Sequence, residues 1–183
     1  VDYALGSGPM LIGHAHPEVV SAVESQLSKG TTYFALNEHM IALAEEVVEA
    51  VPCAEKVRFA STGTEATFFA MRAVRAYRSK DKILKFEGGF HGMNDYGLMS
   101  MAPTVPQDFP YPTPDALGIP DSINADVLIA PFNDIETTSA IIERYYDELA
   151  GVIVEPLQRI IPPEPGFLEG LRDVTNQYGV PLI

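Results

Sequence analysis

The sequence predicts an α/β fold with a mainly parallel sheet and flanking helices, and two observations support that prediction. Segments with the apolar spacing of an amphipathic helix alternate with short apolar segments along most of the chain. The short segments are apolar throughout, as in 151–154, which is typical of strands that are covered on both faces. We therefore expect parallel strands that are connected by helices, without an internal repeat or a low-complexity segment.

The first part of the chain predicts two helices. Residues 1–16 are rich in glycine and irregular, and Pro17 then suits the first position of a helix that Gly30 ends. The apolar stripe of this helix consists of Val20, Val23 and Leu27. Asn37 is expected to cap a second helix, which ends before Pro52. Its buried side carries Ile41, Ala44, Val48 and Val51.

A turn of small residues, 61–66, lies between an extended apolar segment, 57–60, and a strongly helical segment, 66–78. A strand, a small-residue turn and a helix in this order direct free backbone N–H groups toward an anion, because the first turn of a helix has unpaired donors and a partial positive charge. The turn lacks the lysine of a Walker loop and the spacing of a dinucleotide-binding fingerprint. On the local pattern alone, a helix capped by Thr62 or Thr64, without a ligand, is the alternative interpretation.

The second half of the chain predicts further strands and two helices. The strands cover 82–87, 126–132 and 151–156, and a last one begins at Val180. Asp134 is expected to cap a helix whose apolar face carries Ile141, Ile142, Tyr145 and Leu149. Another helix runs from Phe167 to Tyr178 and is closed by Gly179. The proline-rich stretch 102–125 is expected to form a long surface loop that covers the site.

The composition limits the classes of function. With 183 residues the chain can form a sizeable core, and its net charge of −13 argues against a nucleic acid or an anionic membrane as a partner. A single cysteine, Cys53, excludes an internal disulfide framework and suits a cytoplasmic location. No apolar run reaches membrane-spanning length. His14 and His16 have no acidic or cysteine ligand beside them, so we expect no metal site.

Two polar features follow predicted strands. Phe90 and His91 lie between glycines directly after the strand 82–87, and Glu155 lies at the end of the strand 151–156. Open α/β sheets bind their ligands at the carboxyl ends of the strands. We therefore expect the turn at 61–66, the Phe90 loop and Glu155 to converge at one edge of the sheet.

The motifs, taken in order, resemble those of the class III aminotransferases, which are pyridoxal-phosphate enzymes of fold type I, and within that family the glutamate-1-semialdehyde aminomutase-like group. The resemblance covers essentially the whole chain. It rests on the segments Gly8-Pro9-Met10, Gly13-His14-Ala15-His16-Pro17, Ser61-Thr62-Gly63-Thr64-Glu65-Ala66-Thr67, Lys85-Phe86-Glu87-Gly88-Gly89-Phe90-His91-Gly92, Glu155-Pro156, Gly166-Phe167-Leu168 and Gly179-Val180-Pro181-Leu182-Ile183. It implies part of the large domain of an aspartate aminotransferase-like fold. In that fold, residues 1–37 are an N-terminal segment with a helix and a pocket or dimer-interface loop, and residues 38–183 begin the cofactor-binding large domain.

The resemblance implies how the chain binds pyridoxal 5'-phosphate. Gly63 and Thr64 would hold the phosphate, and Phe90 would stack on the pyridine ring. His91 would support the Phe90 loop rather than transfer protons. Glu155 would organise hydrogen bonds near the hydroxyl edge of the cofactor and the substrate.

The resemblance also implies a substrate entrance, lined by Ser7, Tyr33 and Phe34 near the interface of a homodimer. The family further needs a lysine that forms the Schiff base and a carboxylate that keeps the pyridine nitrogen protonated. The carboxylate follows a strand such as Leu182-Ile183, and the lysine comes later. None of the lysines in this chain has a matching context (Lys29, Lys56, Lys80, Lys82 and Lys85). We therefore expect a truncated chain that is inactive by itself.

The implied activity is the transfer of an amino group between a small-molecule amino donor and a carbonyl acceptor. The glutamate that many members carry after Glu-Pro-x-Gln is absent, because this chain continues with Arg159-Ile160. The asparagine and the glycine-serine loop of the aminomutase are absent too, which favours a transaminase. The alternative is the intramolecular amino shift of glutamate-1-semialdehyde 2,1-aminomutase. A second alternative is a non-catalytic phosphate-binding fragment in which the turn at 61–66 is only a capped helix.

Overall fold

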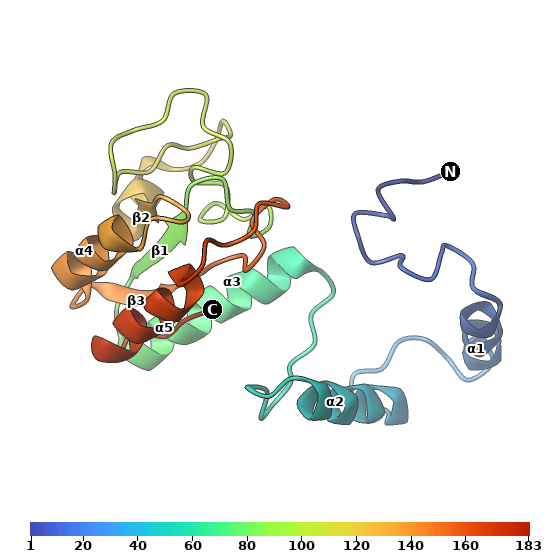
Figure 1. The fold of residues 1–183 in the computed structure, drawn as a ribbon. Helices are drawn as coiled ribbons and strands as arrows, with labels where there is room; N and C mark the ends of the chain where they lie inside the picture. The colour runs from blue at the N-terminus through green and yellow to red at the C-terminus, as the bar shows by residue number, and fades with distance from the viewer. The chain divides into compact units, whose positions relative to one another are not determined.

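The computed structural model describes all 183 residues, which form two compact units, Val1–Arg58 and Phe59–Ile183. We call them the N-terminal unit and the sheet unit. The predicted boundary between residues 37 and 38 concerns the parts of a complete enzyme and stays a prediction. The elements are α1 Pro17–Leu27, α2 Glu38–Ala50, α3 Gly63–Arg78, β1 Lys82–Phe86, η1 Asp121–Asp126, β2 Val127–Ala130, α4 Ile135–Tyr145, β3 Leu149–Val152 and α5 Phe167–Gln177 (Figure 1).

The N-terminal unit contains the two helices that the sequence predicts. Pro17 occupies the first turn of α1, and the side chain of Asn37 accepts a hydrogen bond from the N–H of Met40 at the start of α2. His39 Nε2 of α2 lies 2.9 Å from Gln26 Oε1 of α1, which joins the two helices. Neither helix contains a buried residue, so the predicted apolar stripes are not buried within the N-terminal unit.

A parallel sheet with the strand order β2-β1-β3 forms the centre of the sheet unit. Leu84 of β1 lies opposite Leu128 of β2 and Val152 of β3. The end of the chain adds to the β3 side, where Leu182 forms a parallel bridge with Val152. The middle strand β1 is therefore covered on both edges.

Helices and loops cover both faces of this sheet, because successive side chains of a strand point to opposite faces. Leu84 and Phe86 of β1 pack in one cluster with α4 and α5, whereas Ile83 packs with Met71 of α3 on the other face. In α5 the apolar residues recur at the spacing that forms one stripe along a helix, and this stripe faces the sheet. It consists of Phe167, Leu171 and Val174. None of the helices combines the length and apolar character that crossing a bilayer requires.

The structure differs from the sequence prediction at several places. The strand expected at 151–156 ends at Val152, so Glu155 lies in the loop after it, and the strand expected from Val180 is only a bridge at Leu182. Residues 57–60 form no strand, since no strand of the sheet pairs with them. Leu149 does not continue the apolar face of α4 but opens β3, because α4 ends at Tyr145 and the carbonyl of Glu148 accepts from the N–H of Lys82 in β1. The predicted long loop contains the short 3-10 helix η1.

Replacing Gly151 in β3 by alanine is expected to lower the free energy of unfolding by about 1–3 kcal/mol, the usual cost of overpacking. The new Cβ would lie 2.8 Å from Val74 Cγ2 of α3 and 3.3 Å from the carbonyl oxygen of Pro181. Urea unfolding followed by circular dichroism measures the loss. The V74A/G151A variant is the control, because it removes the methyl groups in the way and should lose less than the sum of the two single variants. Additive losses would contradict the contact.

Candidate functional site

The N-terminus of α3 has donors that the chain itself does not use. Thr62 caps the helix, since its hydroxyl oxygen accepts from the N–H of Glu65 at 3.1 Å, and the Glu65 carboxylate accepts from the N–H of Ser61 at 2.8 Å. No acceptor in the chain is bonded to the N–H of Gly63 or Thr64. Free donors at the positive end of a helix of 16 residues are suited to an anion.

The loop after β1 lies directly against this helix start. The Thr64 hydroxyl oxygen accepts from the N–H of Met93 at 3.1 Å, and the Thr67 hydroxyl donates to the carbonyl of His91 at 2.7 Å. Gly92 has φ +87°, and a Cβ there would lie 2.6 Å from Thr64 Cα. Because that space is taken by backbone, only glycine fits. The turn and the Phe90 loop therefore meet as predicted.

Glu155 completes this group of residues. Its Oε2 accepts from the N–H of Phe90 at 2.9 Å, which links the loop after β3 to the loop after β1. The Phe90 ring is 42% exposed and offers a flat apolar surface next to the helix start. The guanidinium carbon of Arg159 lies 5.4 Å from the centre of that ring.

Beneath the loop, His91 and Gln158 are both 4% exposed. The Gln158 amide nitrogen donates to the carbonyl of Glu87 at 2.7 Å, which fixes the loop of Glu155 to the end of β1. His91 Nε2 and Gln158 Oε1 have no partner, and they flank Gly89, since a Cβ there would lie 3.0 and 3.2 Å from them. Burial, together with the charge of Lys85, lowers the pKa of His91 to about 3. His91 is therefore neutral at pH 7.

Lys85 is a buried cation behind the site. Its side chain is fully enclosed, and Nζ donates to the carbonyl oxygens of Gly97 and Met99. Burial lowers the pKa of Lys85 from 10.5 to about 8, although the charge of Asp115 acts in the opposite direction. Lys85 thus holds the chain after the His91 loop, and its Nζ is used by the protein itself.

A tight turn follows Glu155 and Gln158. The N–H of Ile161 donates to the carbonyl of Gln158 at 2.8 Å, and the two residues between them have positive φ, +49° at Arg159 and +66° at Ile160. A left-handed conformation costs an L-residue about 1–2 kcal/mol, and a β-branched residue adopts it rarely. Strain of this kind persists where the surrounding structure imposes it, and it is common at functional sites.

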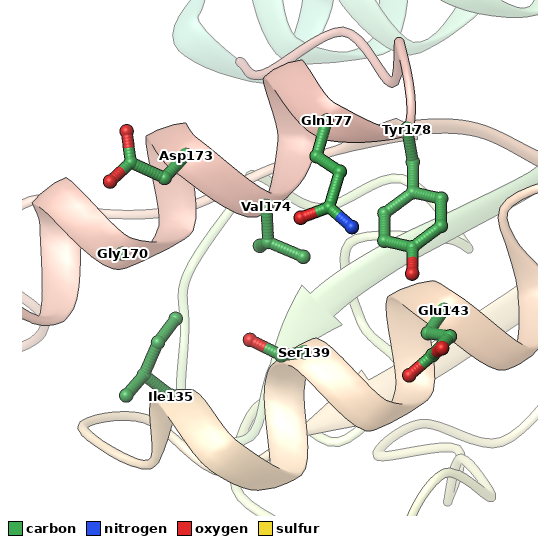
Figure 2. Close-up of a pocket in the computed structure, with 8 residues that line it drawn as sticks. All are labelled: Ile135, Ser139, Glu143, Gly170, Asp173, Val174, Gln177 and Tyr178. Atoms are coloured by element: carbon green, nitrogen blue, oxygen red, sulfur yellow. The ribbon is translucent and has the colours of Figure 1, made fainter.

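The remaining predicted residues lie elsewhere. Ser7, Tyr33 and Phe34 belong to the N-terminal unit, where the Tyr33 hydroxyl donates to the carbonyl of Lys29 at 2.9 Å and Phe34 is exposed. Their predicted place at a substrate entrance stays a prediction. A hollow of about 370 Å³ between α4 and α5 contains none of the predicted site residues (Figure 2). We therefore do not associate it with the site.

A sequence model of the family described as aminotransferase class-III matches residues 1–183. The chain belongs to the class III aminotransferase family. The family and the fold class that the motifs predicted are thus confirmed.

Relatives of this aminotransferase chain include enzymes with two kinds of name. It is 44% identical over 186 residues to a glutamate-1-semialdehyde 2,1-aminomutase of Methanothermobacter thermautotrophicus, a match that covers 100% of the chain and 43% of the relative. It resembles the crystal structure of an omega-transaminase from Sphaerobacter thermophilus with a TM-score of 0.94 and 40% identity, over 99% of this chain and 43% of that one. A glutamate-1-semialdehyde aminomutase from Pseudomonas aeruginosa PAO1, solved in complex with PMP, gives a TM-score of 0.81 and 25% identity. That match covers 100% of this chain and 40% of the aminomutase. The chain therefore spans less than half the length of these proteins.

Sequence reasoning on the class III chain missed three residues of this region. Lys85 lies between the buried apolar residues Leu84 and Phe86 of β1, and a charge at such a position was a visible signal of a buried cation. Gln158 belongs to a quoted motif but received no role, and only the structure reveals its bond to the carbonyl of Glu87. Thr67 gave no signal, because a threonine in the second turn of a helix usually bonds only within that helix.

The buried Lys85 predicts an unusual pH dependence of the stability of this aminotransferase chain. Because the pKa falls from 10.5 to about 8 on folding, the unfolded chain holds the proton between these values and the folded chain has released it. The free energy of unfolding should therefore rise with pH from about 8 to 10.5, by about 1.4 kcal/mol per pH unit. Urea unfolding of the wild type and of Lys85→Met across this pH range gives the free energy of unfolding of each protein. The difference between the two proteins removes the contribution of the other titrating groups. Parallel curves for the two proteins would contradict the prediction.

Proposed function

We propose that this chain provides the phosphate-binding and ring-stacking part of a pyridoxal-phosphate-dependent aminotransferase. The observation that supports the proposal is the hydrogen-bonded contact of three segments that are distant in the sequence. Glu155 accepts from Phe90, the carbonyl of His91 accepts from Thr67, and Thr64 accepts from the N–H of Met93. A capped helix with no ligand needs none of these contacts.

The residues present fit the cofactor. A phosphate needs several donors, and the turn offers the N–H of Gly63, the N–H of Thr64 and the hydroxyl hydrogen of Thr64, whose oxygen is occupied by Met93. Phe90 offers its ring as a stacking surface, and Glu155 fixes the backbone from which that ring projects. His91, neutral and buried, supports the loop and does not move a proton near pH 7.

When bound, pyridoxal phosphate withdraws electrons from the carbon next to the substrate nitrogen, which makes the proton on that carbon acidic. The residues of this chain bind and orient the cofactor for that chemistry. Gly63 and Thr64 would hold its phosphate, and Phe90 would stack on its ring. One carboxylate oxygen of Glu155 is engaged by Phe90, and the other is available to a polar group at the edge of the ring.

The proposal also covers the complete enzyme of which this chain is a part. We propose that Ser7, Tyr33 and Phe34 line a substrate entrance near the interface of a homodimer, and that the enzyme is cytoplasmic. Its substrates are a small amino donor and a carbonyl acceptor. The Schiff-base lysine and the carboxylate at the pyridine nitrogen have no candidate in this chain, which spans 43% of the relative from M. thermautotrophicus.

A second candidate function is the intramolecular amino shift of an aminomutase, because the sequence relatives at 41–44% identity carry the name glutamate-1-semialdehyde 2,1-aminomutase. Structural similarity favours the transaminase. The S. thermophilus omega-transaminase has a TM-score of 0.94 and 40% identity, against 0.81 and 25% for the P. aeruginosa aminomutase. The chain also has Arg159-Ile160 after its Glu-Pro-x-Gln motif, where the aminomutase group is expected to have an asparagine.

An assay of the longer protein that contains this chain separates the two functions. Incubated with pyridoxal phosphate, alanine and a panel of 2-oxo acids and aldehydes, a transaminase should release pyruvate in step with the amination of one acceptor. Incubated with glutamate-1-semialdehyde alone, an aminomutase should form 5-aminolevulinate without any acceptor. Formation of 5-aminolevulinate without release of pyruvate would contradict the transaminase proposal. If neither product forms, a non-catalytic protein is favoured.

Thr64→Ala is expected to weaken retention of pyridoxal phosphate by about 1–3 kcal/mol, since one hydrogen bond to a charged group is lost. Equilibrium dialysis, with cofactor absorbance as the readout, measures the dissociation constant. Thr64→Ser is the matched control, because it keeps the hydroxyl and should bind almost as the wild type does. Equal affinity of the alanine and serine variants would remove Thr64 from the phosphate site.

A further inference from the structure

Arg159 is an exposed cation without an acidic partner beside the site. Its guanidinium lies 5.4 Å from the centre of the Phe90 ring, and none of the ion pairs in the structure includes it. The other cation of this region, Lys85, is enclosed and bonded to backbone carbonyls, so Arg159 is the one that a ligand can reach.

The turn that carries Arg159 is anchored on both sides of the residue. Before it, Gln158 is buried and bonded to the carbonyl of Glu87, and after it the N–H of Ile161 closes the turn onto the carbonyl of Gln158. Arg159 and Ile160 are left in left-handed conformations that neither side chain favours. The strained backbone of this turn thus holds Arg159 near the Phe90 ring. Neither Arg159 nor Ile160 is buried.

The same loop presents both charges of a zwitterion. Glu155 and Arg159 are four residues apart, yet they form no ion pair with each other. Glu155 is directed to the N–H of Phe90, and Arg159 lies by the ring of Phe90. A guanidinium binds a carboxylate through two parallel hydrogen bonds, which a simple amine substrate cannot use.

We infer that Arg159 binds the carboxylate of an amino-acid or oxo-acid substrate and so makes this enzyme selective for carboxylate-bearing substrates over simple amines. The inference rests on the proposed transaminase function of the same site. Arg159 is then a specificity residue at the mouth of the site, and Gln158 is the residue that positions it.

The test compares two pairs of amino donors with the longer protein that contains this chain, loaded with pyridoxal phosphate. Alanine is paired with isopropylamine, and 3-amino-3-phenylpropanoate with 1-phenylpropylamine, so that within each pair a methyl group replaces the carboxylate. Arg159→Ala should lower kcat/KM for the acids by about tenfold or more, mainly through KM, and should change it for the amines less than about twofold. Arg159→Lys should recover part of the loss, because it keeps the charge without the paired donors.

Arg144→Ala is the matched control. Arg144 also lies over an aromatic ring, 5.2 Å from the centre of Tyr145, but it is on α4, and its replacement should leave both kinds of donor unaffected. Binding of the unreactive acid 3-phenylpropanoate, followed by cofactor fluorescence, gives a readout that does not depend on turnover. It should weaken in Arg159→Ala and not in Arg144→Ala.

Two results would overturn the inference in distinguishable ways. Equal losses for acids and amines, or weaker retention of pyridoxal phosphate in Arg159→Ala, would mean that Arg159 only orients Phe90, while the transaminase function stands. A wild-type protein that transfers an amino group from none of the four donors would overturn the proposed function, and the specificity of Arg159 with it.

Discussion

The bond from the Phe90 N–H to the Glu155 carboxylate is the interaction on which the site depends. It can form because β1 and β3 are parallel neighbours, so their carboxyl ends lie at the same edge of the sheet. A backbone N–H donating to a carboxylate is charge-assisted and stronger than a bond between neutral groups. It fixes the loop after β1 at Phe90, and Thr64 and Thr67 of α3 then bind the next residues of that loop.

The electrostatics behind this loop follow from one buried cation. Lys85 takes an inward-facing position on the middle strand, which is tolerable only because Nζ is bonded to the carbonyls of Gly97 and Met99. Burial lowers the pKa of His91, and the charge of Lys85 lowers it further, so His91 stays neutral. A neutral histidine can support a loop without repelling the charge of Lys85 and without transferring a proton. The positive charges that stay accessible to a ligand are the partial charge at the start of α3 and the guanidinium of Arg159.

The sequence was sufficient for the convergence of the site, because uniformly apolar strands imply a parallel sheet and such a sheet aligns its carboxyl ends. The sequence was insufficient where the structure of a segment depends on the strand with which it pairs. Residues 57–60 are as apolar as a strand, but a strand forms only beside another strand, and none lies there. The apolar period of α4 continues to Leu149, yet pairing with β1 takes that residue into the sheet. The left-handed turn at Ile160 has no glycine or asparagine to indicate it.

In the proposed site, the turn at Arg159 and Ile160 lets one short loop both hold the cofactor and contact the substrate. The side of the loop that would face the cofactor is held by the hydrogen bonds of Glu155 and Gln158. The substrate face must vary between enzymes that share the cofactor, and Arg159 and Ile160 are exposed between those anchors and Ile161. The turn is closed by the backbone bond from the N–H of Ile161 to the carbonyl of Gln158, and no hydrogen bond joins the side chain of Arg159 or Ile160 to Glu155. In the proposed site, this loop would separate the binding of the cofactor from the choice of substrate.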